Sequence, residues 1–350
     1  MTGNPFLGIF LHAIGGLASA SFYLPFRGVK KWSWESYWLV GGFFSWMVVP
    51  WVTAFLTVPE LLTVLREAPG ESLWWSYFFG VLWGIGGLTF GLSMRYLGMS
   101  LGYAMALGFC AAFGTLIPPV FHGEFLEIVR SGPGQTILAG VALCLVGIAI
   151  CGRAGVRKER ELSEEEKKET IQEFHFARGV WVAVFAGIMS ACMAFGIAAG
   201  APIAETAVQH GTPSLWQNSA VFVVVLPGGF TTNLIWCAIL NARKRSWRDY
   251  FDARRSPLGL NYAFCALAGL TWYLQFLFYG MGTTRMGKFD FSSWTLHMAF
   301  IIIFSNFWAI YLREWRGVSR PTKALVWAGI LGLIVSTVVV GIGNYYASSP

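Results

Sequence analysis

The chain has 350 residues, of which 55% are hydrophobic, 17% are aromatic and only 12% are charged. An average soluble domain carries roughly 25% charged residues, so this composition excludes an ordinary soluble protein and indicates a membrane protein. The formal net charge of +7 raises the question of a nucleic-acid partner. Because the basic residues fall in loops between apolar runs and form no basic motif, we expect no nucleic-acid partner.

Ten apolar runs are each long enough to cross a bilayer core about 30 Å thick as a helix. We expect these helices at residues 5–26, 36–58, 73–93, 100–121, 135–152, 178–199, 215–239, 260–282, 291–312 and 324–346. A β-barrel is excluded, because barrel strands are about half as long and alternate in hydropathy. The sequence therefore predicts an all-α integral membrane protein with ten transmembrane helices.

The orientation follows from the basic residues, because cytoplasmic loops carry the excess of lysine and arginine. Loops after odd-numbered spans hold 21 of the chain's 25 basic residues. The other four are Arg66, Arg130, Arg285 and Lys288. We therefore expect the odd-numbered loops to be cytoplasmic and both termini to lie outside.

Two similar halves are joined by a charged segment. We expect a first five-helix repeat over 1–156, a charged cytoplasmic linker over 157–177 and a second five-helix repeat over 178–350. At a constant offset, Gly80, Trp83, Gly91 and Gly98 align with Gly269, Trp272, Gly280 and Gly287. Because each half has an odd number of spans, the second enters the membrane from the opposite face. Such inverted repeats are typical of secondary transporters, which bind substrate near the midplane.

The stretch WYLQFLFYG, which begins at Trp272, places one glutamine among aromatic rings. An unpartnered carboxamide in hydrocarbon is costly, so Gln275 is expected to face protein or a wet cavity. Its donors and acceptor suit sugar hydroxyls, and Trp272, Tyr273 and Tyr279 offer flat apolar faces. Trp83, like Trp272, falls near mid-span, at the depth where such transporters bind their ligands. A structural hydrogen bond at the glutamine and simple packing of the tryptophans are the alternatives.

The stretch DFSSWTLHM contains the candidate proton-coupling residues. Asp290, Trp294 and His297 are spaced at i, i+4 and i+7, which predicts one shared helix face. Ionisable groups inside a membrane are costly and typically serve as proton relays or ligand partners. His12 lies at comparable depth in the first span. Glu35, at the inner start of the second span, is either a helix-end carboxylate or a further proton-coupling group.

The sequence contains no complete motif of the common enzyme classes compared below. GTTRMGK, which ends at Lys288, resembles a phosphate-binding loop, but Phe289 replaces the Ser or Thr that would hold magnesium. The patterns HExxH and GxSxG are absent. The six cysteines lack metal-ligand spacing, so we expect buried free thiols. The sequence predicts no enzyme, no cofactor and no metal site.

The chain resembles the L-rhamnose/proton symporter family of bacterial inner membranes, which belongs to the drug/metabolite transporter superfamily. The resemblance is carried by FYLPFRGVKKWSWE (22–35), MRYLGMSLG (94–102), WYLQFLFYG (272–280) and SWTLHM (293–298). It implies ten helices in two inverted five-helix repeats, with both termini periplasmic. It also implies proton-coupled uptake of a 6-deoxyhexose by alternating access, with L-rhamnose as the first candidate.

The resemblance also implies the site residues. The substrate would be contacted by Trp83, Thr89, Trp272, Tyr273, Gln275, Tyr279 and Trp294. The proton would be coupled through Asp290, His297, His12 and Glu35. The third span departs from the family pattern, because Gly87 and Thr89 stand where the family has asparagines. This departure bears on the identity of the sugar more than on sugar transport.

Two alternative functions stay open at this point. One is an exporter or exchanger of another sugar or small metabolite, and the other is a membrane sensor of the same fold that transports nothing. The expected partners are the sugar, the proton and membrane lipid. Oligomeric state, proton stoichiometry and order of binding are left open by the sequence.

Overall fold

The computed structural model describes residues 4–97, 99–121, 123–161 and 176–348. Within these ranges the regular elements are all helices, and no β-strand occurs. Ten helical segments there are long and apolar enough to cross a membrane. The prediction of an all-α integral membrane protein with ten transmembrane helices is therefore confirmed.

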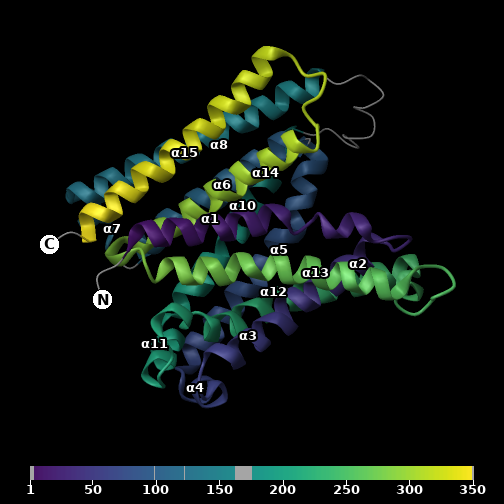
Figure 1. The fold of residues 1–350 in the computed structure, drawn as a ribbon, viewed down its shortest axis with the longest axis horizontal. Coiled ribbons are helices and arrows are strands. Elements are labelled where there is room, and N and C mark those ends of the chain that lie inside the picture. Colours follow the sequence, from purple (N-terminus) through teal and green to yellow (C-terminus); the bar gives the residue numbers. More distant parts are fainter. Residues whose placement is uncertain (1–3, 98, 122, 162–175, 349–350) are drawn as a thin grey trace. The chain divides into compact units, whose positions relative to one another are not determined.

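The elements are labelled along the chain in Figure 1. The first half of the chain contains α1 (Pro5–Ser21), η1 (Pro25–Gly28), α2 (Trp34–Phe43), η2 (Phe44–Val48), α3 (Val49–Thr57), α4 (Leu61–Glu67), α5 (Gly70–Leu97), α6 (Met99–Phe121), α7 (Phe125–Arg130) and α8 (Gly132–Glu161). The second half contains α10 (Phe176–Ala199), α11 (Ala201–Gln209), η3 (Ser214–Trp216), α12 (Ser219–Lys244), η4 (Ser246–Tyr250), α13 (Leu258–Thr283), η5 (Gly287–Ser292), α14 (Ser293–Tyr311) and α15 (Arg320–Ser348).

Helix α8 is longer than the sequence indicated, since it continues past residue 152 to Glu161. The Glu161 carboxylate accepts hydrogen bonds from the backbone N–H and hydroxyl of Ser319 and from the Thr322 hydroxyl. These contacts tie the end of α8 to the start of α15, where free N–H groups favour an anion. Residues 162–175 of the predicted linker lie outside the described residues.

The second span is composite. It runs from α2 into η2, a short π-helix, and then into α3. Pro50 stands at the start of α3. A proline has no N–H for the preceding turn and its ring clashes with the carbonyl four residues earlier, here that of Trp46. The wider π-helical turn accommodates this clash, and such turns occur frequently at functional sites.

The chain forms two compact units. Unit 1 contains residues 1–17, 86–194 and 282–350, and unit 2 contains residues 18–85 and 195–281. Each unit therefore draws on both halves of the sequence. Helices α1, α5, α10 and α13 contribute residues to both units.

In unit 1, α8 and α15 lie side by side along most of their length (Figure 1). Glycines on their facing surfaces allow this close approach, because a Cβ at Gly329 would lie 2.9 Å from the backbone nitrogen of Cys151. At one end of unit 1, the Phe6 and Tyr345 rings are 5.8 Å apart. The beginning of α1 and the end of α15 therefore lie at the same end, as an even number of spans requires.

In unit 2, the loops after odd-numbered and even-numbered spans gather at separate places. Ser33, after the first span, donates its N–H to Asp249, after the seventh. His210, after the sixth span, contacts Glu67, after the second, at 2.8 Å. This pairing agrees with the predicted alternation of the loops. Which compartment each end faces stays a prediction.

Candidate functional site

Unit 2 contains a continuous group of rings, here called the aromatic cluster: Phe22, Trp38, Trp46, Trp83, Phe230, Trp272 and Phe276. Trp272 on α13 stacks on Phe22, with ring centroids 4.4 Å apart and planes inclined by 21°. The Trp38 ring lies 5.0 Å from Trp272, and its N–H donates to the Asn233 side chain at 3.0 Å. Two residues of the predicted site, Trp83 and Trp272, are thus in one cluster.

Trp46 joins the two predicted tryptophans. Its ring centroid lies 5.7 Å from that of Trp83 and 4.8 Å from that of Trp272, edge-on in both cases. The ring rests on Gly42, where a Cβ would approach it to 2.6 Å. Its indole N–H is buried and has no hydrogen-bond acceptor among the described residues. Trp46 was not among the residues predicted from the sequence, although Pro50, four residues later, is a signal of irregular helix.

Gln275 follows Trp272 by three residues on α13, and only 5% of it is exposed. No other described residue forms a hydrogen bond with its amide. Among the described residues, no structural hydrogen bond from this amide joins two helices, and its role stays a prediction. A buried amide without partners is costly, and ligand hydroxyls would satisfy it.

Three other predicted substrate contacts differ in their settings. Tyr273 is fully buried against Phe222, with ring centroids 6.4 Å apart, and Tyr279 is 6% exposed. Both belong to unit 2. Thr89 belongs to unit 1, is half-buried and donates its hydroxyl to the Gly86 carbonyl of its own helix at 3.2 Å. Nearby, a Cβ at Gly87 would meet nothing within 4 Å, so this side of α5 has room for a larger residue.

Unit 1 brings His12 and His297 together. His12 on α1 and His297 on α14 have ring centroids 6.5 Å apart and are 0% and 2% exposed. The His12 ring lies against α13, because a Cβ at Gly282 would be 2.7 Å from its Cε1 atom. The sequence placed both histidines at comparable depth on separate helices, and the structure makes them neighbours.

The histidine pair is supported by close packing of α14. Trp294 lies 6.2 Å from the His297 ring and donates its N–H to the Cys110 carbonyl at 3.1 Å. One residue later, the Thr295 hydroxyl bonds to that of Thr115 at 2.7 Å. Trp294 is thus in unit 1, beside the histidines.

Asp290 lies outside α14, the helix that carries Trp294 and His297, so a face shared by all three residues stays a prediction. Helix α14 begins at Ser293, and Asp290 lies in the preceding 3-10 turn η5. Phe289 within this turn has non-helical dihedral angles, φ −107° and ψ 45°. The spacing argument assumed a regular helix from Asp290 onward. Asp290 is exposed, whereas Trp294 and His297 are buried.

Glu35 lies in a polar network at one end of unit 2. Its fully buried carboxylate accepts from the Lys244 ammonium at 2.9 Å and from the Ser246 hydroxyl at 2.7 Å. The Asn241 side chain extends the network to the Tyr250 hydroxyl. Burial raises the pKa of Tyr250, which keeps the phenol neutral. These contacts are those of an anchored helix-end carboxylate.

The comparisons with known proteins decide the family. The family model described as "L-rhamnose-proton symport protein" matches residues 1–346. A protein of Cronobacter sakazakii named L-rhamnose-proton symporter is 38% identical over 340 residues, which cover 96% of this chain and 97% of that protein. Proteins of the same name from Yersinia pestis and Salmonella paratyphi B are each 37% identical with the same coverage. The chain belongs to the L-rhamnose-proton symport protein family.

Membership in the L-rhamnose-proton symport protein family confirms the resemblance found in the sequence. The family is one of transporters and not of enzymes. With the ten apolar helices, it makes the chain a multi-pass membrane transporter. Among the described residues, the aromatic cluster and the histidine pair contain most of the predicted site residues.

Proposed function

We propose that this protein takes up L-rhamnose together with a proton across the bacterial inner membrane, by alternating access. The observation that carries the proposal is the match along almost the entire chain to proteins named L-rhamnose-proton symporters. Both termini are periplasmic in this proposal, since the basic residues lie in the loops after odd-numbered spans.

The aromatic cluster and Gln275 form the sugar site in this proposal. A 6-deoxyhexose has hydroxyl groups and an apolar methyl group, and it needs polar partners beside flat apolar surfaces. The Trp46 N–H is a buried donor with no acceptor among the described residues, and the Gln275 side chain, which is 5% exposed, offers an amide. The rings of Trp46, Trp83 and Trp272 provide the apolar surfaces.

The proton binds at the histidine pair in this proposal. Histidine is the side chain that exchanges a proton near neutral pH, and intramembrane histidines commonly relay protons. Two imidazoles 6.5 Å apart resist being charged together, so the pair would hold one proton at a time. Asp290, exposed before α14, would deliver the proton from outside. Glu35 has the ion pair described above and serves as an anchor.

Helix α13 offers a physical connection between sugar and proton. It is continuous from Leu258 to Thr283 and carries both Gln275 and Gly282. These two residues are seven positions apart, which corresponds to about 10 Å along the helix axis. The His12 ring packs directly on Gly282. A small movement of α13 on sugar binding would therefore change the packing around the His12 ring. This change is a route for coupling the binding of sugar to the binding of the proton.

The inverted repeat is part of the proposal. Trp83 and Trp272, which align in the sequence, are both in unit 2. Helices α8 and α15, the fifth span of each half, pack together in unit 1. Corresponding helices from the two halves thus meet within one unit, as a two-fold relation between the halves requires.

Uptake into proteoliposomes tests the proposed function. Labelled L-rhamnose is expected to accumulate above its external concentration under an inward proton gradient, and accumulation should stop when a protonophore is added. Gln275→Ala should lose most of this uptake, whereas Gln209→Ala, the same change at an exposed position on α11, should retain it. Accumulation that persists without the gradient would contradict symport. Sugar binding without flux in either direction would support a sensor.

A further inference from the structure

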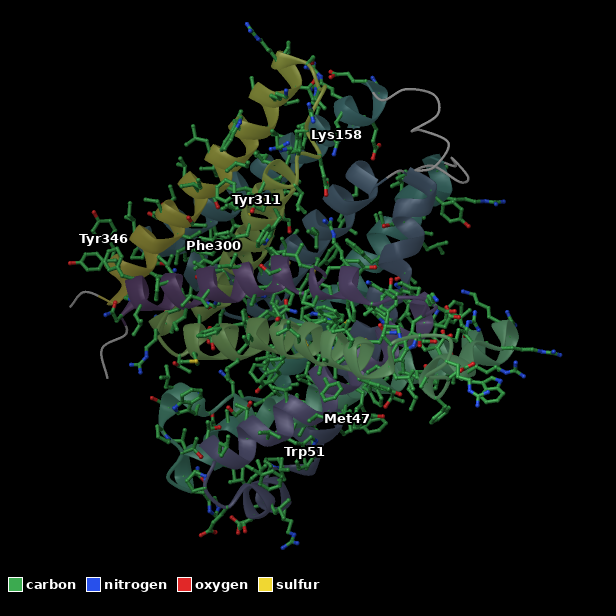
Figure 2. All side chains as sticks on the ribbon, turned by 45° about the vertical axis from the view of Figure 1, so that its right-hand side comes forward. Met47, Trp51, Lys158, Phe300, Tyr311 and Tyr346 are labelled. Atoms are coloured by element: carbon green, nitrogen blue, oxygen red, sulfur yellow. The ribbon has the colours of Figure 1, made fainter. Side chains whose placement is uncertain are left out.

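A groove of about 470 Å³ opens in unit 1 where α14 turns into α15. It is lined by Ile310, Arg313, Trp315, Arg316, Lys323, Val326 and Trp327. The turn has a defined shape, with left-handed backbone at Arg313 (φ 61°) and Gly317 (φ 83°). Figure 2 labels two residues that mark this region: Lys158, near the end of α8, and Tyr311, the last residue of α14. Its lining residues include none of the aromatic cluster or the histidine pair.

The polar side of the groove is cationic. Arg313, Arg316 and Lys323 form no ion pair or side-chain hydrogen bond with any described residue. Two acidic side chains near this turn in the sequence contact other groups. Glu314 lies 3.9 Å from the Lys158 ammonium, and Glu161 accepts the bonds from Ser319 and Thr322. Among the described residues, none forms an ion pair with these three basic side chains, and such a group of positive charges favours an anionic ligand.

The other side of the groove is apolar and belongs to a membrane-spanning surface. Trp327 on α15 is 51% exposed, and its ring lies 6.2 Å from Phe307 of α14. Val326 is buried beneath it. Trp315 is held below the Lys158 ammonium, which is 5.0 Å from its ring. Tryptophans at the ends of membrane spans commonly lie at headgroup depth.

We propose that this groove binds one anionic phospholipid, whose phosphate diester contacts Arg313, Arg316 and Lys323 while an acyl chain follows Trp327. Basic pockets between membrane helices on the cytoplasmic side bind acidic lipid headgroups. The groove lies after the ninth span, in a loop predicted to be cytoplasmic, so the lipid comes from the inner leaflet. The combination of charge at one wall and exposed apolar surface at the other fits a lipid better than a soluble phosphate ester.

Lipid retention measured by native mass spectrometry tests this inference, with phosphatidylglycerol as the probe and phosphatidylcholine as the neutral comparison. The wild-type protein is expected to retain one phosphatidylglycerol in preference to phosphatidylcholine. Neutralising the groove with Arg313→Gln, Arg316→Gln and Lys323→Gln together should weaken phosphatidylglycerol binding about 10-fold to 100-fold. The matched control is Arg243→Gln, Arg254→Gln and Arg255→Gln, the same loss of charge at exposed positions in unit 2.

Two further experiments distinguish binding of a lipid from binding of a soluble anion and from misfolding of the variants. Trp327→Ala should weaken retention of phosphatidylglycerol severalfold, and millimolar glycerol phosphate should not displace the lipid. Arg316→Lys keeps the charge and should keep the lipid, which shows that the fold tolerates change there. Equal loss of lipid in the groove variant and the matched control would overturn the inference, and so would displacement by glycerol phosphate. Because the assay contains no sugar, its outcome is independent of the proposed transport function.

Discussion

The aromatic cluster of unit 2 and the histidine pair of unit 1 differ in how their polar groups are arranged. In the aromatic cluster, the rings of Trp83 and Trp272 pack against Trp46, whose buried indole N–H has no acceptor among the described residues. Around the histidine pair, short contacts between hydroxyls, a glycine and a tryptophan hold two imidazoles in place. The first arrangement suits a neutral ligand with many hydroxyls, and the second suits a proton. In the proposed function, sugar binding and proton binding therefore belong to different units.

The largest expected effect comes from the histidine pair. His297→Gln removes the group that we propose carries the proton but keeps a polar side chain of similar size. We expect gradient-driven accumulation of L-rhamnose to be abolished, whereas exchange of labelled for unlabelled sugar across the membrane should continue. Uptake and counterflow assays on the same proteoliposomes measure both. If His297→Gln still accumulated sugar against a gradient, the proton would have to bind elsewhere.

The second effect comes from the aromatic cluster. Trp46→Phe removes the unpaired indole N–H and keeps an aromatic ring, so one hydrogen bond to the sugar should be lost. Such a bond is worth about 1 kcal/mol, which corresponds to roughly a 5-fold to 10-fold fall in kcat/KM for uptake. Trp74→Phe, on the exposed surface of α5, is the matched control. Equal uptake by Trp46→Phe and Trp74→Phe would show that the Trp46 N–H does not bind the sugar. It would not test the contribution of the other rings in the aromatic cluster.

Helix α5 allows the packing of the two units to be compared on one element. At Gly80, in unit 2, a new Cβ would collide with the Val225 carbonyl of α12, whereas at Gly91, in unit 1, it would meet nothing within 4 Å. Gly80→Ala should therefore destabilise the protein by about 1–3 kcal/mol, and Gly91→Ala should not. Thermal unfolding in detergent measures the difference. Equal melting temperatures would mean that α5 and α12 are not closely packed.

The smallest expected effect separates anchoring from proton coupling at Glu35. Glu35→Gln keeps the hydrogen bond with Ser246 but removes the ion pair with Lys244, whose side chain is 56% exposed. Because exposed partners contribute little, the free energy of unfolding should fall by about 1 kcal/mol or less. Proton-driven accumulation should be retained. If Glu35→Gln folded normally but no longer accumulated sugar, Glu35 would take part in proton coupling.

The sequence predicted the membrane helices well because an apolar run of about 20 residues can satisfy its backbone hydrogen bonds inside a bilayer only as a helix. It also placed Gln275 in a buried setting, since an amide has few favourable places in hydrocarbon. It could not predict the Glu35 ion pair, because Lys244 is 209 residues away in the chain. The lengthening of α8 likewise depends on distant partners, Ser319 and Thr322.

Two features of the structure depart from regular helices. The spacing of Asp290, Trp294 and His297 predicts a shared face along one α-helix, whereas α14 begins at Ser293 and Asp290 lies in the 3-10 turn before it. In the second span, the π-helical turn before Pro50 brings Trp46 into the aromatic cluster. Local departures from the α-helix depend on how backbone groups are satisfied in three dimensions, and periodicity alone does not report them.

The most direct test of the account is whether a sugar gradient can drive protons. Proteoliposomes are loaded with a pH-sensitive dye, held at zero membrane potential without a proton gradient, and given external L-rhamnose. The account predicts that the lumen acidifies as sugar enters the wild-type protein, and that no acidification occurs with His297→Gln or with a sugar that is not transported. Entry of labelled L-rhamnose with no change in luminal pH would contradict it.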